Sequence, residues 1–92
     1  MALQDTLQAL SDPTRRQILN MLKGGKKTAG EISEAFEISG PAISRHLAVL
    51  KAANLIRDRR DGKFIIYELS TSVLEEIMMW VKDLKETPKG EK

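Results

Sequence analysis

The chain has 92 residues, enough for one domain whose core is too small to give a wide stability margin. Hydrophobic residues make up 41% and charged residues 30%, a balance typical of a soluble globular protein rather than a disordered tail. The formal net charge of +2 is too small by itself to indicate a polyanionic partner. The absence of cysteine excludes disulfides, thiolate metal ligands and thiol redox switching.

The sequence carries no sign of a membrane span, a leader or a catalytic motif. No apolar run approaches the roughly 20 residues that a bilayer requires, and the N-terminus lacks the pattern of a signal peptide. The chain is therefore expected in the cytoplasm. With a single histidine and no phosphate-binding loop, it is not expected to be an enzyme. No internal boundary divides residues 1–92, which predicts one domain.

The first ten residues predict a short amphipathic helix with a narrow apolar stripe. The stripe consists of Leu3, Leu7 and Leu10. Ser11 or Asp12 can cap a second helix, since Pro13 suits a first turn in which its missing N–H costs nothing. This helix is expected to end at Gly24-Gly25, because glycine tolerates the conformation that closes helices. Its inward residues are Ile18, Leu19 and Leu22.

Two further helices are predicted after a loop that holds Lys26 and Lys27. Thr28 and Glu31 have the spacing of a capping box, which begins a short third helix ending near Glu37. Its buried residues are Ile32, Ala35 and Phe36. After a tight turn, a fourth helix runs from Ser39 through Gly40-Pro41 to about Ala53. Its apolar face consists of Ile43, Leu47 and Leu50.

From Leu55 the pattern changes and predicts a β-hairpin, with strands at residues 55–60 and 63–69. The Asp61-Gly62 pair is a strong signal for a two-residue turn, which needs positive φ at both central positions. The aromatic and apolar residues of the second strand are interpreted as packing residues, because four aromatic residues in the whole chain do not make a single-strand binder. They are Phe64, Ile66 and Tyr67.

Residues 72–86 predict a last helix, capped by Thr71 or Ser72 and carrying a wide apolar face. The face consists of Val73, Leu74, Ile77, Met78, Val81 and Leu84, with Trp80 beside it. It can bury against its own domain, but a terminal helix with this face more often needs a second subunit. Residues 87–92 are expected to form a flexible tail. The resulting order, four helices, a hairpin and one helix, predicts a mainly helical α+β winged helix-turn-helix.

Residues 28–53 form the candidate helix-turn-helix, whose second helix can enter a major groove. With the apolar face inward, Arg45 lies near the opposite face beside the small Ala42 and Ala48 and can pair with a guanine edge. The other DNA-binding candidates on this helix are Ser39, Ser44 and His46 for bases or phosphates and the Gly40 amide for a phosphate. The alternative for this segment is an ordinary solvated helix face.

The hairpin, residues 55–69, carries four basic side chains against two acidic ones between positions 57 and 63. The basic residues are Arg57, Arg59, Arg60 and Lys63. Such a wing can lie on the phosphate backbone or enter a minor groove, although it can also be only a charged, soluble hairpin. A winged helix that docks proteins without touching DNA is the alternative function. Basic groups on both the helix and the wing argue against it.

These residues resemble the ArsR-type winged-helix repressors of bacteria. The segments that match the family pattern, in order, are Leu10-Ser11-Asp12-Pro13-Thr14-Arg15-Arg16 with Ile18-Leu19, Ser44-Arg45-His46-Leu47 with Leu50-Lys51, and Arg60-Asp61-Gly62-Lys63 with Tyr67. The resemblance implies a transcriptional repressor, acting as an autorepressor, that binds a palindromic double-stranded operator as a homodimer through its first and last helices. The interface residues are then Leu3, Leu7, Val73, Ile77, Met78, Trp80, Val81 and Leu84.

The chain departs from the metal-sensing members of that family. Its one histidine, His46, lies in the reading helix with no second nitrogen ligand, and the acidic residues of the last helix are interpreted as a solvated face. These acidic residues are Glu75, Glu76, Asp83 and Glu86. We therefore expect no metal and no cofactor. The chain is similar to a subgroup without metal ligands, the sporulation-delay autorepressors, which implies release by a membrane-bound partner protein that sequesters it.

Overall fold

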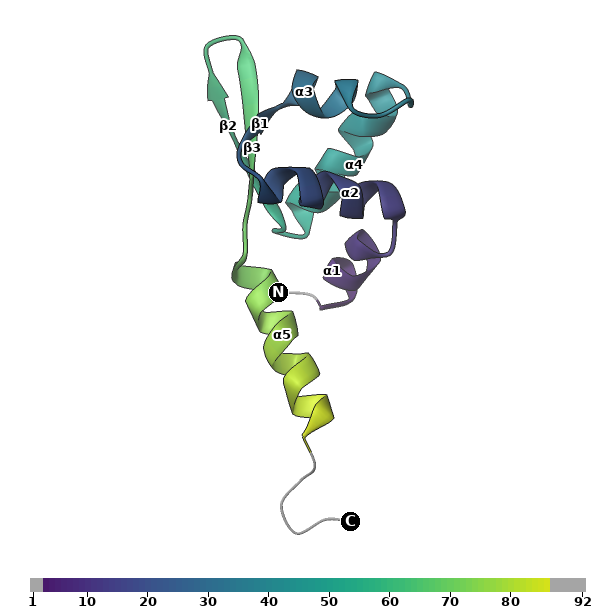
Figure 1. Ribbon diagram of the computed structural model, residues 1–92, viewed down its shortest axis with the longest axis vertical. Helices are drawn as coiled ribbons and strands as arrows, with labels where there is room; N and C mark the ends of the chain where they lie inside the picture. Colours follow the sequence, from purple (N-terminus) through teal and green to yellow (C-terminus); the bar gives the residue numbers. More distant parts are fainter. Residues whose placement is uncertain (1–2, 87–92) are drawn as a thin grey trace.

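The computed structural model describes residues 3–86, which form five helices and a three-stranded sheet (Figure 1). The elements are α1 Leu3–Leu10, α2 Pro13–Lys23, β1 Lys27–Thr28, α3 Ala29–Glu34, α4 Gly40–Ala52, β2 Ile56–Asp61, β3 Phe64–Leu69 and α5 Ser72–Lys85. The predicted class and the order of helices and hairpin are confirmed. The tail predicted for residues 87–92 lies outside the described residues.

Side-chain caps begin α2, α3 and α4 near the positions predicted from sequence. The side-chain cap predicted for α5 is not formed, because its N-cap residue Thr71 makes no side-chain capping hydrogen bond. Asp12, rather than Ser11, caps α2, because its carboxylate accepts the Arg15 backbone N–H at 3.1 Å. The capping box of Thr28 and Glu31 is confirmed, since each side chain accepts the backbone N–H of the other residue. However, α3 ends at Glu34 and not near Glu37, with Ala35 as its C-cap.

The end of α4 depends on a residue that the sequence reading did not single out. Asn54 has a φ of 61°, the left-handed conformation that asparagine tolerates better than most residues. The Leu55 N–H then donates to the Leu50 carbonyl, and the Asn54 N–H donates to the Lys51 carbonyl. This pair of bonds is a Schellman motif, which closes α4 and turns the chain directly into β2.

The sheet has the order β1-β3-β2, and its first strand was missed by the sequence reading. Lys27 pairs with Tyr67 and Thr28 with Ile66, so the segment predicted as a loop forms a short antiparallel strand. A strand of two residues shows no alternation, because a period of two needs several residues to be seen. Its partner in β3 is 38 or more positions further along the chain, so only the tertiary fold reveals the pairing.

The hairpin turn is shifted by one residue from its predicted position. Asp61 pairs with Phe64, so the two-residue loop is Gly62-Lys63 and not Asp61-Gly62. Gly62 has a φ of +63°, whereas Lys63 is not among the residues with positive φ. Positive φ at the first central position alone is the pattern of a type II′ turn, in which glycine takes that position. The prediction of positive φ at both central positions was therefore wrong.

The core lies between α1, α2, α3, α4 and the base of the hairpin. Its fully buried large side chains include Ile18, Ile32, Leu50, Leu55 and Ile56. Tyr67 packs against this core, and burial raises the pKa of its hydroxyl, to which the nearby Asp58 carboxylate adds. The packing role predicted for Tyr67 is thus confirmed.

The helix α5 extends away from this core, at the end opposite the hairpin tip (Figure 1). Val73 in its first turn is buried in the core of its own domain, and it is the one buried residue of the helix. The remaining three turns therefore have most of their apolar side chains in solvent. Within the described residues, only the first half of α5 packs on the domain, through Val73, Leu74 and Ile77, and the second half extends beyond the core.

Candidate nucleic-acid interface

One face of α4 is free for a ligand because the opposite face holds the core. Ile43, Leu47 and Leu50 are buried, whereas Ser44, Arg45 and Ala48 are exposed. Within the described residues, the Arg45 guanidinium has no hydrogen bond or ion pair. An exposed arginine with five unused donors between small neighbours can approach base edges in a major groove.

The N-terminal end of α4 adds neutral donors to this face. The Ser39 hydroxyl accepts the Ala42 N–H at 3.2 Å as the N-cap, so its own O–H is free to donate. Gly40 is exposed, and its amide belongs to the first turn, where N–H groups lack helical partners. Ala42 is half-buried. This end of α4 can therefore hold a phosphate.

His46 does not lie with Ser44 and Arg45 on the exposed face of α4. Its side chain is 19% exposed, and its Nδ1 lies 3.2 Å from the Arg15 guanidinium and 3.9 Å from the Asp12 carboxylate. The sequence reading placed His46 on the flank of the reading face. Helical spacing alone could not show that Arg15 of α2 and Asp12, the N-cap residue of α2, occupy that flank.

The wing presents its four basic residues differently. Arg57 is held by Glu68 of β3, at 3.2 Å between guanidinium and carboxylate. Arg59 and Arg60 are exposed, and within the described residues neither has an ion pair. Consecutive strand residues point to opposite faces, so Arg59 and Arg60 present charge on both sides of the hairpin. Lys63 is exposed in the turn.

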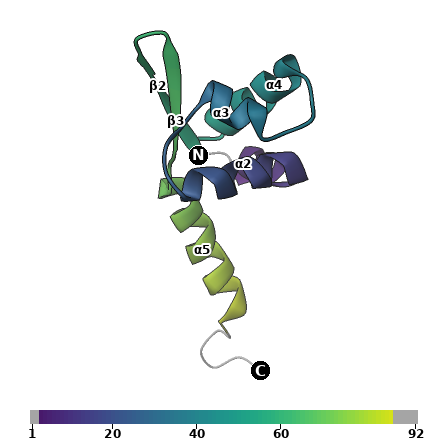
Figure 2. The ribbon, with the colours of Figure 1, turned by 45° about the horizontal axis from the view of Figure 1, so that its top comes forward.

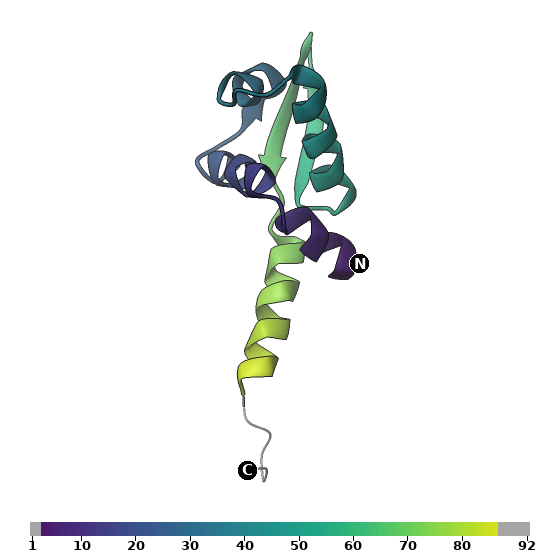
Figure 3. The same ribbon diagram turned by 90° about the vertical axis from the view of Figure 1, so that its right-hand side faces the viewer.

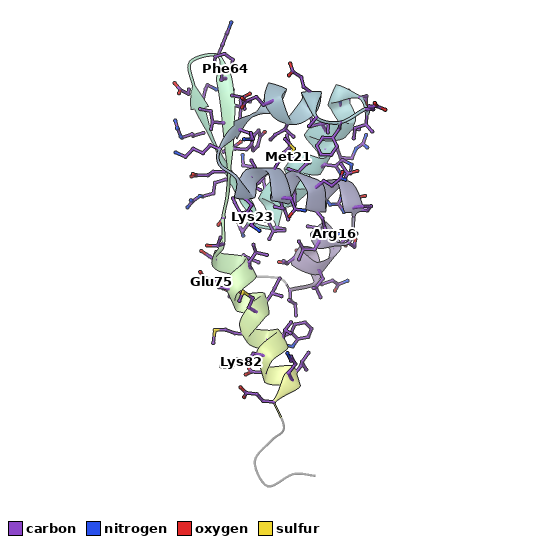
Figure 4. All side chains as sticks on the ribbon, viewed as in Figure 1. Arg16, Met21, Lys23, Phe64, Glu75 and Lys82 are labelled. Carbon is purple, nitrogen blue, oxygen red and sulfur yellow. The ribbon has the colours of Figure 1, made fainter. Side chains whose placement is uncertain are left out.

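Phe64 lies at the hairpin tip (Figure 4) and is 52% exposed, which corrects its interpretation as a packing residue. The Lys63 ammonium stands 5.5 Å from the centre of its ring, within the range of a cation–π contact. The tip thus places an aromatic ring and a cation together in solvent. The alternation of apolar residues in β3 could not predict the exposure of Phe64, because the strand extends beyond the core at its turn end.

The wing is braced against α4 by an ion pair between Lys51 and Asp58. The Lys51 ammonium lies 3.1 Å from the Asp58 carboxylate, joining the last turn of α4 to β2. In both Figures 1 and 2, the hairpin tip and the helices α3 and α4 lie at the end of the molecule away from α5. The cations of α4 and of the wing can therefore face the same duplex.

Most residues predicted for a dimer interface are exposed apolar side chains. Those exposed are Leu7, Met78, Trp80, Val81 and Leu84, with exposed fractions of 41 to 67%. Leu3 and Ile77 are half-buried. Val73 differs from this set, because it is buried in the core of its own domain. An apolar groove of about 590 Å³ lies along α5 between Ile77 and Glu86.

The described residues contain no group of three or more potential metal-ligating side chains. None of their helices is long and apolar enough to cross a membrane.

The capping carboxylate of Asp12 gives the fold a pH dependence. The Arg15 backbone N–H holds the pKa of Asp12 below its ordinary value, with a further contribution from the Arg15 charge. Its stabilising contribution is therefore present above the unfolded-state pKa of about 4 and is lost as pH falls through the lower folded-state pKa. Asp12→Asn keeps a capping oxygen but does not titrate.

We accordingly expect wild type to be more stable than Asp12→Asn near pH 6, and this difference to shrink by about pH 3. Urea midpoints of both proteins measured across this range check the expectation. A difference that stays constant with pH would contradict the role given to the carboxylate.

Comparison with known proteins shows which family this chain resembles in sequence. Residues 12–58 match the family described as "Bacterial regulatory protein, arsR family". The chain is 52% identical over 79 residues to the transcriptional repressor SdpR of Bacillus subtilis, covering 86% of this chain and 88% of that protein. It is 43% identical over 67 residues to the HTH-type transcriptional regulator Rv2034 of Mycobacterium tuberculosis, covering 73% and 63% of the two chains.

Solved structures agree with the sequence comparisons. A crystal structure of an ArsR family transcriptional regulator superposes with a TM-score of 0.90 at 26% identity, covering 98% of this chain and 93% of that one. HlyU from Vibrio cholerae superposes with a TM-score of 0.73 at 30% identity, covering 90% of both chains. The chain therefore belongs to the ArsR family of bacterial regulatory proteins and is a DNA-binding transcriptional regulator with a winged helix-turn-helix fold.

Proposed function

We propose that this chain is a transcriptional repressor that binds a palindromic operator as a homodimer, with α4 in the major groove and the β2–β3 wing on the flanking backbone. The observation that carries the proposal is the exposed Arg45 guanidinium on α4, which has no hydrogen bond or ion pair within the described residues. The helix α4 and the hairpin that carries the wing cations lie together at the end of the molecule away from α5 (Figure 1). The name of the Bacillus subtilis relative, a transcriptional repressor, supports repression as the outcome of binding.

The division of labour within the interface follows from the chemistry of each group. Arg45 can read a guanine through two parallel hydrogen bonds, while Ser39, Gly40 and Ser44 contact phosphates or neighbouring bases. Arg59, Arg60 and Lys63 neutralise phosphates without reading sequence. Arg57 contributes less, because Glu68 already holds its guanidinium.

The dimer is supported by the apolar side of α5. Trp80, Val81 and Leu84 lie within one side of the helix at about 100° per residue, and all three are exposed. A twofold axis would let α5 pack on its own copy, with α1 beside it through Leu3 and Leu7, and bury one patch against its equivalent. The same axis gives two α4 helices and hence a palindromic site.

Fluorescence anisotropy tests the proposal, with purified protein on the DNA upstream of its own gene and on a random duplex of equal length. At about 150 mM salt, where non-specific binding is weak, we expect tight and selective binding with two protomers per site. Equal and weak binding to both duplexes would favour the alternative, a docking domain that does not touch DNA.

The wing role predicts a change in salt dependence for Arg59→Ala. Because each lost phosphate contact lowers the salt slope by about 1, a dimer with two substituted wings should lose about 2 from the slope of log K against log salt. Operator and random duplexes should weaken by the same factor. Arg57→Ala serves as the comparison and should change the slope less. A loss confined to the operator would instead make Arg59 a sequence-reading residue.

Two features implied by the family resemblance complete the proposal. The protein works in the cytoplasm, where its DNA is, and it is released by a membrane-bound partner protein rather than by a small ligand. Co-expression with the product of a neighbouring membrane-protein gene, followed by fractionation, tests the release step. Protein that stays out of the membrane fraction would count against it.

A further inference from the structure

The Arg15 side chain joins two helices that the proposed function uses for different purposes. Its Nε donates to the Ala9 carbonyl at 2.8 Å and its Nη2 to the Gln8 carbonyl at 3.1 Å, both in the last turn of α1. Its Nη1 lies 3.2 Å from Nδ1 of His46 in the middle of α4. One guanidinium thus connects the end of α1 to the helix that carries Arg45.

The α1 side of this bridge follows from the needs of a helix terminus. The last four carbonyls of a helix lack intrahelical donors, and α1 has no basic residue of its own in its last turn. The short connection at Ser11-Asp12 folds α2 back, so that Arg15 and Arg16 supply these donors, with Arg16 donating to the Leu10 carbonyl at 2.8 Å. A positive charge is also favourable at this end of a helix.

The α4 side of the bridge is the Nδ1 atom of His46. A guanidinium only donates, so this contact is a hydrogen bond in the tautomer whose Nδ1 carries no proton. The ring is largely buried, and it is held away from the exposed face on which Arg45 lies. His46 therefore connects α4 to Arg15 on the inner side of the helix, away from the face proposed to contact DNA.

The bridge matters because the boundary between α1 and α4 is only partly filled: Ala9 of α1 is buried in the core, whereas a cleft opens beside Arg15. A cleft of about 320 Å³ lies beside Arg15, lined from α1 by Asp5 and Gln8 and from α4 by Val49 and Ala52. Figure 3 shows α1 next to the lower end of α4, on the same side of the sheet. Where side chains leave such a space, a directional polar contact has more influence on how two helices are oriented.

We propose that Arg15 and His46 form a positioning bridge that fixes the orientation of α4 relative to α1. The proposal rests on the proposed function, in which α1 borders the dimer axis and α4 reads a half-site. The bridge then links the dimer interface to the reading helix, so that the spacing of the two α4 helices matches the operator. His46 is a positioning residue here and touches no DNA.

Operator binding of a matched set of variants tests the bridge. Arg15→Ala and His46→Phe should each lower the ratio of operator to random-duplex affinity by about tenfold, and the double variant should lose no more than either alone. The salt slope should stay at the wild-type value, because no phosphate contact is removed. His46→Asn, which offers an oxygen near the position of Nδ1, should restore most of the ratio.

Arg16→Ala is the control, since it removes one charge and one bond to the end of α1 without touching α4. It should keep the wild-type ratio. Additive losses for Arg15→Ala and His46→Phe, or a salt slope lowered by about 2 in His46→Phe, would overturn the bridge and make His46 a direct DNA contact.

Hydrogen exchange of the free protein tests the bridge without DNA. Amides of α4 should exchange faster in Arg15→Ala and in His46→Phe than in wild type or Arg16→Ala. Unchanged exchange in both variants would overturn the proposal. A wild-type protein that fails to select its operator would contradict the proposed function, while the exchange rates would still decide the bridge.

Discussion

Leu84→Glu should convert the protein to a monomer and weaken its binding to a full operator by about 100-fold or more, because the second half-site is no longer bound within one complex. Leu84 is 66% exposed on the apolar side of α5, so the charge falls on the proposed interface and not in the core. Two copies of the new carboxylate would meet across the twofold axis. Sedimentation velocity and operator anisotropy measure the two effects.

Met79→Glu is the matched control for this variant. Met79 is 69% exposed on the same helix. It lies five residues before Leu84, and at about 100° per residue this spacing puts it on the other side of the helix. The two variants therefore introduce the same charge at sites of nearly equal exposure. We expect Met79→Glu to remain dimeric and to bind normally. Equal dimerisation of both variants would show that this side of α5 is not the interface.

Arg45→Ala should lower discrimination between operator and random DNA by about 1 to 3 kcal/mol, which corresponds to roughly 5- to 150-fold. The physical reason is the loss of two parallel hydrogen bonds to one guanine in each half-site. Because the Arg45 side chain has no partner within the described residues, its removal leaves no buried group unsatisfied. Anisotropy titrations on both duplexes give the ratio.

Arg45→Lys separates base reading from charge. Lysine keeps the positive charge but lacks the planar fork that pairs with two acceptors. We expect random-duplex binding to match wild type while operator binding falls most of the way to that of Arg45→Ala. If Arg45→Lys keeps full selectivity, the residue acts as a phosphate contact and the reading of sequence lies elsewhere on α4.

Local sequence was sufficient to predict most of the fold. Capping residues such as Asp12, Thr28 and Ser39 act within three positions of themselves, so their effect can be read directly from the chain. The buried face of α4 could be predicted in the same way, because Ile43, Leu47 and Leu50 recur at helical spacing over three turns. The short α3 and the turn at Gly62 were predicted with boundaries that differ from the structure.

The candidate interface was predicted in part. The exposure of Arg45 followed from helical geometry, because an apolar face on one side of α4 leaves the other side in solvent. The pairing of Arg57 with Glu68 depends on the register of β2 and β3, and the exposure of Phe64 depends on how far the hairpin extends beyond the core. Neither the register nor the length of hairpin beyond the core can be predicted from the residues of one strand.

The sequence by itself determined the helices, the hairpin and the cations that they carry, because propensity, capping and periodicity act over a few neighbouring residues. Only the tertiary structure decided which side chains meet across long separations. It brought β1 beside β3, buried Val73 in the core and set Arg15 against His46, 31 positions away. These contacts result from the packing of whole elements around one core, which no local pattern encodes.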